Sequence, residues 1–156
     1  MNISFDLDGT LIPYADEFNT EKIGWLGKLF RIEKIRKGAK DLILKLQQDN
    51  YKIHIYTTSF RSKSKIRRTL KYYGISVNRI VNQIENQKVL KSKNIYSSKF
   101  PPAFNFDVHI DDLSGVRIEG EKQNFKTIIV DPSDLNWSET IMNNLKNIEI
   151  KKENAQ

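Results

Sequence analysis

Cysteine is absent from this chain of 156 residues, and its absence excludes two kinds of structure. No disulfide can form, which fits a protein of the reducing cytoplasm. Zinc sites built on thiolates are excluded as well. The two histidines, His54 and His109, would make a poor zinc site by themselves. We therefore expect a cytoplasmic protein that does not depend on zinc.

Long apolar runs are also missing. No stretch is long enough to cross a bilayer as a helix, so we expect no membrane association. The first residues show neither the basic region nor the apolar segment of a signal peptide. Hydrophobic residues make up 38% of the chain and charged residues 29%, which is typical of a globular protein with one core. We expect a single domain at residues 1–150 and a polar tail at residues 151–156.

Acidic residues are fewer than basic residues in this chain. The chain has 26 Lys plus Arg residues against 19 Asp plus Glu residues, which gives a formal net charge of +7. Such an excess favours anionic partners, for example phosphorylated molecules, nucleic acid or an acidic surface. A solvated lysine-rich surface would produce the same number, so composition leaves both interpretations open.

Short segments rich in Ile, Val, Phe and Tyr predict five strands, at residues 2–7, 51–57, 79–82, 106–110 and 126–130. Apolar stripes at helical spacing predict helices around Ala39, Leu42, Ile43 and Leu46, around Ile66, Leu70 and Tyr73, and around Ile141, Met142, Leu145 and Ile148. Gly74 stands where a C-cap is expected, and Ser138 where an N-cap is expected. The alternation predicts a three-layer α/β/α Rossmann-like domain with a central, mostly parallel sheet.

Polar clusters follow three of the predicted strands. They are Asp6 with Asp8, then Thr57, Thr58 and Ser59, then Asp111 with Asp112. Ligands of open parallel sheets bind outside the carboxyl ends of the strands. Three coincidences of this kind indicate a functional site at that edge.

The first cluster belongs to the segment Asp6-Leu7-Asp8-Gly9-Thr10-Leu11. Two carboxylates held close together away from water are unfavourable unless a cation binds between them, and hard oxygen ligands suit Mg²⁺. A solvated Asp-Gly turn is the alternative. A calcium loop of the EF-hand type is excluded because Leu11 occupies the position that requires glycine.

In their order and strand-end positions, these segments resemble the four motifs of the haloacid dehalogenase superfamily. The motifs are Asp6-Leu7-Asp8-Gly9-Thr10, Ile55-Tyr56-Thr57-Thr58-Ser59, a lysine before the fourth strand, and Ile110-Asp111-Asp112. The stretch from Lys99-Phe100-Pro101-Pro102 to Asp111-Asp112-Leu113-Ser114-Gly115-Val116 is similar to small, phosphatase-type members. The resemblance extends from the first strand to Pro132.

The resemblance implies that Asp6 is a nucleophile that forms an aspartyl-phosphate, and that Asp8 is the general acid and then the base. Members that are not phosphatases often lack the second aspartate, so Asp8 favours phosphoryl transfer over dehalogenation. Thr57 would bind an oxygen of the transferred phosphoryl group. The alternative for Thr57 is an ordinary β-branched strand residue.

A lysine would neutralise charge on the nucleophile and the phosphoryl group. We expect Lys99 in this role and in substrate binding, with Lys91 and Lys93 as alternatives and a solvated surface charge as the default for each.

The resemblance also implies a single Mg²⁺ ion, held by Asp6, by Asp111 directly, and by the backbone carbonyl of Asp8. Asp112 would act through water or orient the site. The alternative for the acid pair is a helix N-cap or a turn.

The segment between Thr10 and Thr57 has room for a small flap and one helix, but not for a large cap domain. We expect a capless enzyme. Capless relatives tend to act on large substrates or to assemble, so the resemblance is compatible with a homo-oligomer.

A basic run follows the Thr57 motif and consists of Arg61, Lys63, Lys65, Arg67 and Arg68. If helical, Arg61, Lys65 and Arg68 would share one face. Thr58 and Arg61 are candidates for substrate binding, and the run could guide an anionic substrate such as nucleic acid. The solvated side of an amphipathic helix is the simpler interpretation.

These observations predict a magnesium-dependent phosphohydrolase that acts on a phosphomonoester. The alternatives are a polynucleotide-end phosphatase, a phosphoprotein phosphatase, and a non-catalytic module that binds metal.

Overall fold

In residues 1–154, which the computed structural model describes, five strands form one all-parallel sheet in the order β3-β2-β1-β4-β5. The strands are β1 (Asn2–Phe5), β2 (Lys52–Tyr56), β3 (Arg79–Val81), β4 (Val108–Asp111) and β5 (Lys126–Ile129). All five predicted strands are present. Four end one or two residues before the predicted end, whereas β4 begins two residues later and includes Asp111.

The central strand aligns the ends of its neighbours. Phe5 of β1 is in register with Ile55 of β2 on one side and with Ile110 of β4 on the other. The residues that follow β1 and β2, and the last residue of β4, therefore lie at one edge of the sheet.

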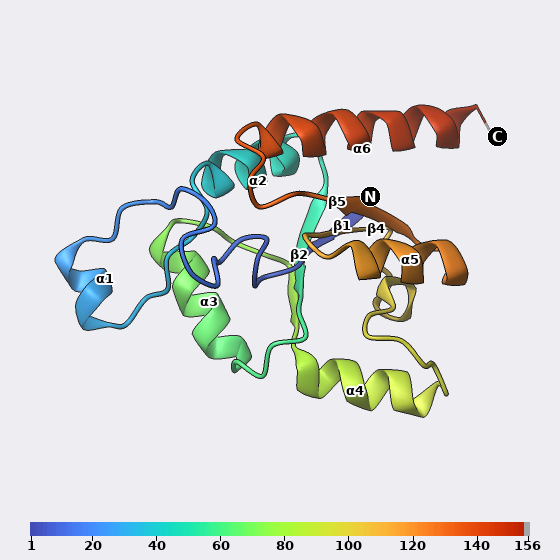
Figure 1. The fold of residues 1–156 in the computed structure, drawn as a ribbon, viewed down its shortest axis with the longest axis horizontal. Coiled ribbons are helices and arrows are strands. Elements are labelled where there is room, and N and C mark those ends of the chain that lie inside the picture. The colour runs from blue at the N-terminus through green and yellow to red at the C-terminus, as the bar shows by residue number, and fades with distance from the viewer. Residues whose placement is uncertain (155–156) are drawn as a thin grey trace.

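The main core lies between the sheet and three helices, which are α2 (Ala39–Gln48), α3 (Lys63–Tyr72) and α6 (Trp137–Glu153). The predicted apolar stripes supply its buried side chains, for example Leu42, Ile66 and Ile141. Figure 1 shows α2 and α6 side by side along this face of the sheet. The prediction of the three helices and of the layered α/β fold is confirmed.

The opposite face carries α4 (Gln83–Ser92), α5 (Ser114–Gln123) and the 3-10 turn η1 (Pro101–Phe104) (Figure 1). Right-handed crossovers require this division, because the chain leaves β3 at one edge and returns to β4 beyond β1. A smaller cluster made of Tyr56, Val81, Phe104 and Phe106 fills the space beneath. The sequence analysis did not predict α4 and α5, since each buries only two residues and shows little periodicity.

One further short helix, α1 (Trp25–Leu29), stands away from the sheet in the segment between β1 and α2 (Figure 1). Its Trp25 and Leu29 side chains are exposed. None of the helices within residues 1–154 combines the length and the apolarity that crossing a bilayer requires.

The helix ends agree with the sequence in one case and not in another. Gly74 follows α3 with φ +74°, and its N–H donates to the carbonyl of Lys71, as a C-terminal glycine does. Ser138 is not the N-cap of α6, because the helix begins at Trp137 and Asn136 holds the capping position. The predicted tail at residues 151–156 is helical up to Glu153, and residues 155–156 lie outside the described part.

A buried arginine ties α6 to the loop beneath it. The Arg36 side chain is 2% exposed, and its guanidinium carbon lies 4.6 Å from the ring centroid of Phe18 and 4.7 Å from that of Trp137. Its Nη2 atom lies within 3.1 Å of three backbone carbonyl oxygens, those of Asp131, Pro132 and Asp134. One buried guanidinium therefore donates to three carbonyl groups of the β5–α6 connection.

Replacing this charge should destabilise the fold. We expect Arg36→Met to lower the free energy of unfolding by on the order of 3 kcal/mol, because buried carbonyls lose a charged donor. Lys34→Met removes one positive charge from an exposed position and is the control. Urea unfolding measures both, and an equal effect of the two substitutions would contradict the role of Arg36.

His54 makes stability depend on pH. Within residues 1–154, neither ring nitrogen of this buried residue has a hydrogen-bond partner, and its ring centroid lies 4.7 Å from that of Phe106. Burial, with Arg79 and Lys52 nearby, lowers the pKa of His54 to about 4 from its ordinary value of 6.5. The unfolded chain therefore binds more protons than the folded chain between these values, so acid favours unfolding there.

We expect His54→Phe to reduce this dependence. Between pH 6.5 and 4, the melting temperature of the wild type should fall more steeply than that of the variant. Melting curves at several pH values test this. Parallel lines for the two proteins would show that His54 contributes nothing to the pH dependence.

Candidate functional site

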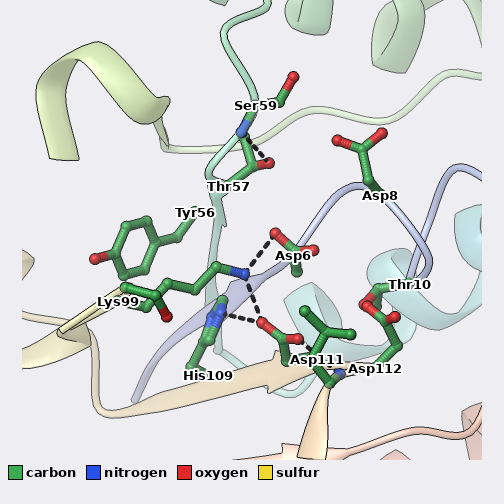
Figure 2. Close-up of polar contacts among 12 residues, drawn as sticks. Asp6, Asp8, Thr10, Tyr56, Thr57, Ser59, Lys99, His109, Asp111 and Asp112 are labelled. Carbon is green, nitrogen blue, oxygen red and sulfur yellow. Dashed lines mark hydrogen bonds and ion pairs between the residues drawn. The ribbon is translucent and has the colours of Figure 1, made fainter. Parts of the chain in front are cut away.

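The three polar clusters meet at the carboxyl edge of the sheet. Asp6 directly follows β1, Thr57 directly follows β2, and Asp111 is the last residue of β4. The strand order reverses between β1 and β4, because β2 and β3 lie on one side of β1 and β4 and β5 on the other. Figure 2 shows the side chains gathered at this switch point, which is where open α/β sheets bind ligands.

The segment after β1 is a compact turn rather than a solvated loop. The N–H of Gly9 donates to the carbonyl of Ile12, and the N–H of Leu11 donates to that of Leu7. Thr10 is buried beneath the turn. Gly9 adopts φ +79°, and a Cβ atom there would collide with the carboxylate of Asp112. The Asp-Gly turn therefore brings two distant segments into contact.

Lys99 lies at the centre of the cluster. Its Nζ atom is 2.7 Å from Oδ1 of Asp6 and 2.5 Å from Oδ2 of Asp111 (Figure 2). All three side chains are buried. The ammonium group thus bridges the two acids that follow β1 and end β4.

Burial and charge act against each other in this trio. Burial would lower the pKa of Lys99, but the charges of Asp6 and Asp111 outweigh burial and raise it, so the amine stays protonated. Burial raises the pKa of Asp6; Lys99 opposes this rise and Asp111 adds to it. Burial also works to raise the pKa of Asp111, but the hydrogen bond from His109 and the charge of Lys99 lower it well below its usual range.

His109 supports Asp111 from within β4. Its Nε2 atom lies 3.0 Å from Oδ2 of Asp111, and its Nδ1 atom lies 2.9 Å from Oγ of Ser4. Burial, together with the charge of Lys99, lowers the pKa of His109, so its ring is neutral at neutral pH. The tautomer that satisfies both contacts donates from Nε2 to Asp111 and accepts at Nδ1 from the Ser4 hydroxyl.

Three carboxylates form the part of the site that could hold a cation. Asp6, Asp111 and Asp112 each offer an oxygen, and these oxygens lie within 4.8 Å of one another. Oδ1 of Asp112 accepts a hydrogen bond of 3.1 Å from Thr10, and burial, helped by the charge of Asp111, raises the pKa of Asp112. Lys99 alone does not balance three acids. All-oxygen ligands suit Mg²⁺, so the residues fit that ion.

Asp111 and Asp112 do not cap a helix. Leu113 holds the N-cap position of α5 and makes no side-chain capping bond, but its N–H donates to Oδ1 of Asp111 at 2.9 Å. The pair therefore forms a local turn as well as part of the acidic cluster.

Asp8 lies apart from the acidic trio (Figure 2). Its Oδ2 atom is 2.7 Å from Nη1 of Arg61, whose Nε atom is 2.8 Å from Oε1 of Glu33. The hydrogen bonds that Arg61 donates to Asp8 and Glu33 outweigh burial and raise the pKa of Arg61. The guanidinium of Arg61, predicted as a substrate contact, thus orients the Asp8 carboxylate, whose Oδ1 makes no hydrogen bond within residues 1–154.

The three hydroxyl residues after β2, Thr57, Thr58 and Ser59, do not all lie in the site. Oγ1 of Thr57 accepts a 3.0 Å hydrogen bond from the N–H of Ser59, and Oγ of Ser59 accepts one of 2.7 Å from Arg61. Thr58 points elsewhere and lines a cavity beside the site. The Thr57 side chain lies near those of Asp6 and Lys99 (Figure 2).

The basic run does not form the continuous face considered above. Arg61 precedes α3, whose N-cap is Ser62, so Arg61 does not share a helical face with Lys65 and Arg68. Lys63 pairs with Glu85, and Lys65 lies 3.6 Å from Glu33. Ion pairs therefore neutralise much of the run.

The candidate lysines occupy different places. The Nζ atom of Lys99 lies in the cluster, whereas Lys91 lines the neighbouring cavity and Lys93 is an exposed residue at the end of α4. Sequence reasoning gave no role in the site to His109 or Glu33. His109 could have been found, because His109 and Asp111 are two positions apart on one strand and so share a face. Nothing in the local sequence connects Glu33 to Arg61.

No protein-family model matches the chain, and no curated protein sequence matches it. The resemblance to the haloacid dehalogenase superfamily therefore stays a prediction from the sequence motifs.

Substitution of two glycines, Gly9 and Gly38, allows the cost of backbone strain to be measured apart from the cost of a steric clash. Gly9 and Gly38 both have positive φ, +79° and +83°, but a Cβ atom at Gly38 would meet nothing within 4 Å. We expect Gly38→Ala to cost about 1 kcal/mol of stability through strain alone. Gly9→Ala should cost clearly more, because Asp112 must also move. Thermal unfolding measures both, and equal losses would contradict the close packing of the turn on Asp112.

Proposed function

We propose that this protein is a magnesium-dependent phosphohydrolase of the haloacid dehalogenase type, which acts on a phosphomonoester through an aspartyl-phosphate. The single observation that supports it most is the position of Lys99 Nζ between Asp6 and Asp111, with Thr57 opposite. A buried cation beside a carboxylate nucleophile is suited to a reaction in which negative charge accumulates.

The acidic trio would hold the metal. Asp6 and Asp111 offer carboxylate oxygens directly, and Asp112 stands behind them with its hydrogen bond from Thr10. When bound, Mg²⁺ would neutralise charge on the phosphoryl oxygens.

In the first half of the reaction, a carboxylate oxygen of Asp6 attacks phosphorus. The bond between phosphorus and the leaving oxygen breaks, and that oxygen takes a proton from Asp8. Lys99 and the Thr57 hydroxyl would stabilise the charge on the phosphoryl oxygens. Arg61 orients the Asp8 carboxylate by its contact with Oδ2 and leaves Oδ1 available for the proton.

In the second half, water attacks the phosphorus of the aspartyl-phosphate. Asp8 takes a proton from this water, and the bond between phosphorus and Asp6 breaks. Inorganic phosphate and the free Asp6 carboxylate result, which restores the starting state of both acids.

The structure has features that favour this reaction over a purely binding role. Two acids and one lysine, Asp6, Asp111 and Lys99, are buried together at a cost in desolvation. Asp8 does not contribute its carboxylate to the metal cluster, so a metal-binding module would have no use for its ordered position. A separate acid beside the cluster is what proton transfer to a leaving group needs.

We expect Asp6→Asn to abolish hydrolysis of a generic aryl phosphate while the circular dichroism spectrum and the melting curve stay those of a folded protein. An amide cannot act as the nucleophile. The loss should be at least about 1,000-fold in kcat, and a chelator should have a comparable effect on the wild type.

Asp49→Asn is the matched control, since Asp49 is exposed at the far end of α2. It should retain wild-type activity. Substantial turnover by Asp6→Asn, or full activity in the chelator, would contradict the proposal. Magnesium binding without turnover on a broad panel of phosphomonoesters would favour the non-catalytic module instead.

A further inference from the structure

A cavity of about 710 Å³ lies between α4 and residues 95–98, beside the candidate site. Two of its lining residues adjoin that site in the chain. Thr58 directly follows Thr57, and Ser98 directly precedes Lys99. The cavity therefore lies one residue along the chain from the site at two points, and none of the steps above uses it.

The cavity is held open by a buried hydrogen-bond network. The hydroxyl of Tyr56 donates to Oδ1 of Asn86 at 2.6 Å and accepts from the N–H of Phe100 at 2.8 Å. Nδ2 of Asn86 in turn donates to the carbonyl of Ser98 at 2.8 Å. Both walls are thus fixed to the end of β2, and a ligand would find a site already formed, which lowers the cost of binding.

One face of α4 provides the lining. Gln83, Gln87, Leu90 and Lys91 follow one another at helical spacing, and Leu90 with Ile95 forms an apolar floor. The Gln87 amide and the Lys91 ammonium make no hydrogen bond or ion pair within residues 1–154. These groups remain available to a ligand.

Two cations beside α4, Lys63 and Arg79, are already paired. Glu85, on a different face of the helix, contacts both Lys63 and Arg79. Lys91 is therefore a free positive charge at the cavity, in a chain whose net charge is +7. A ligand that carries an anionic group near Lys91 would be favoured.

Tyr96 completes the lining with an aromatic ring. Its side chain is 92% exposed although it borders the cavity, so most of its ring surface is free to stack on a planar ligand. Tyrosine rings with neighbouring amide groups are a common means of binding nucleobases, by stacking and by hydrogen bonds to the base edge.

We infer that this cavity binds the nucleoside part of a phosphorylated nucleotide unit, with the base on Tyr96 and its edge on Gln87; in a nucleic acid, the neighbouring phosphate would lie near Lys91. The inference rests on the proposed function, since it assigns the leaving group of that reaction. A free nucleotide and the phosphorylated end of a nucleic acid share this chemistry. They differ in the neighbouring phosphate, which only the nucleic acid supplies.

Steady-state kinetics test the inference with three kinds of substrate. These are nucleoside monophosphates with a 3′ or 5′ phosphate, hexanucleotides with the same ends, and glycerol phosphate as a reference without a ring. Tyr96→Ala and Gln87→Ala should raise KM for the nucleotides about tenfold and leave glycerol phosphate unaffected. Tyr96→Phe keeps the ring and should retain wild-type KM.

Lys91 distinguishes the two sources of the nucleotide. If a nucleic-acid end is the substrate, Lys91→Ala should weaken the binding of hexanucleotides several-fold and change that of mononucleotides little. Lys88→Ala is the matched control, because Lys88 is exposed on α4 and does not line the cavity. Equal effects on both ligands would identify the free nucleotide, which still supports the cavity as the nucleoside site.

Binding to the Asp6→Asn protein separates this inference from the proposed function. Fluorescence anisotropy with labelled phosphorylated hexanucleotides, in magnesium, should show weaker binding for Tyr96→Ala in that background. If this holds and the wild type hydrolyses nothing, the phosphatase proposal fails while the cavity assignment stands. The assignment would be overturned if Tyr96→Ala impaired hydrolysis of glycerol phosphate as much as that of nucleotides, or if it had no effect on either. A preference of the protein for a phosphotyrosine peptide over every nucleotide would overturn it as well.

Discussion

The ammonium group of Lys99, buried between Asp6 and Asp111, is the interaction on which the architecture of the site depends. Taking three charges out of water is costly, and mutual attraction offsets that cost only if the geometry is well defined. Here the geometry is set by β1, by β4 and by the turn before η1. His109 and Ser4 extend the network behind Asp111, so that the carboxylate has a fixed orientation before any ligand arrives.

The sheet connectivity explains why these groups meet. The chain forms β1, β2 and β3 towards one edge and then crosses to β4 on the other side of β1. That crossover leaves the carboxyl ends of β1 and β4 adjacent at the switch point. It also places α4 beside the site, so the cavity along α4 and the acidic cluster are products of the same crossover.

Much of the fold could be read from local patterns, and the exceptions have a common cause. The strands and the helices α2, α3 and α6 face a large core, so burial imposes a clear period on their residues. The helices α4 and α5 cover a smaller core and bury two residues each, which leaves almost no period to detect. The start of α6 was misplaced because Asp134, several residues upstream, organises it by accepting hydrogen bonds from Asn136 and Thr140.

Local patterns in the chain predict the layered parallel fold and the order in which acids, hydroxyls and a lysine follow the strands, because alternation and strand-end position are local properties. The sequence also limited the candidates for the lysine of the site to Lys91, Lys93 and Lys99. Only the tertiary structure decided that Lys99 reaches the acids, that Arg61 holds Asp8 with Glu33, and that Tyr56 and Asn86 keep a cavity open beside them. These contacts join residues 12 or more positions apart in the sequence, and whether two such side chains meet is set by packing, which no local pattern records.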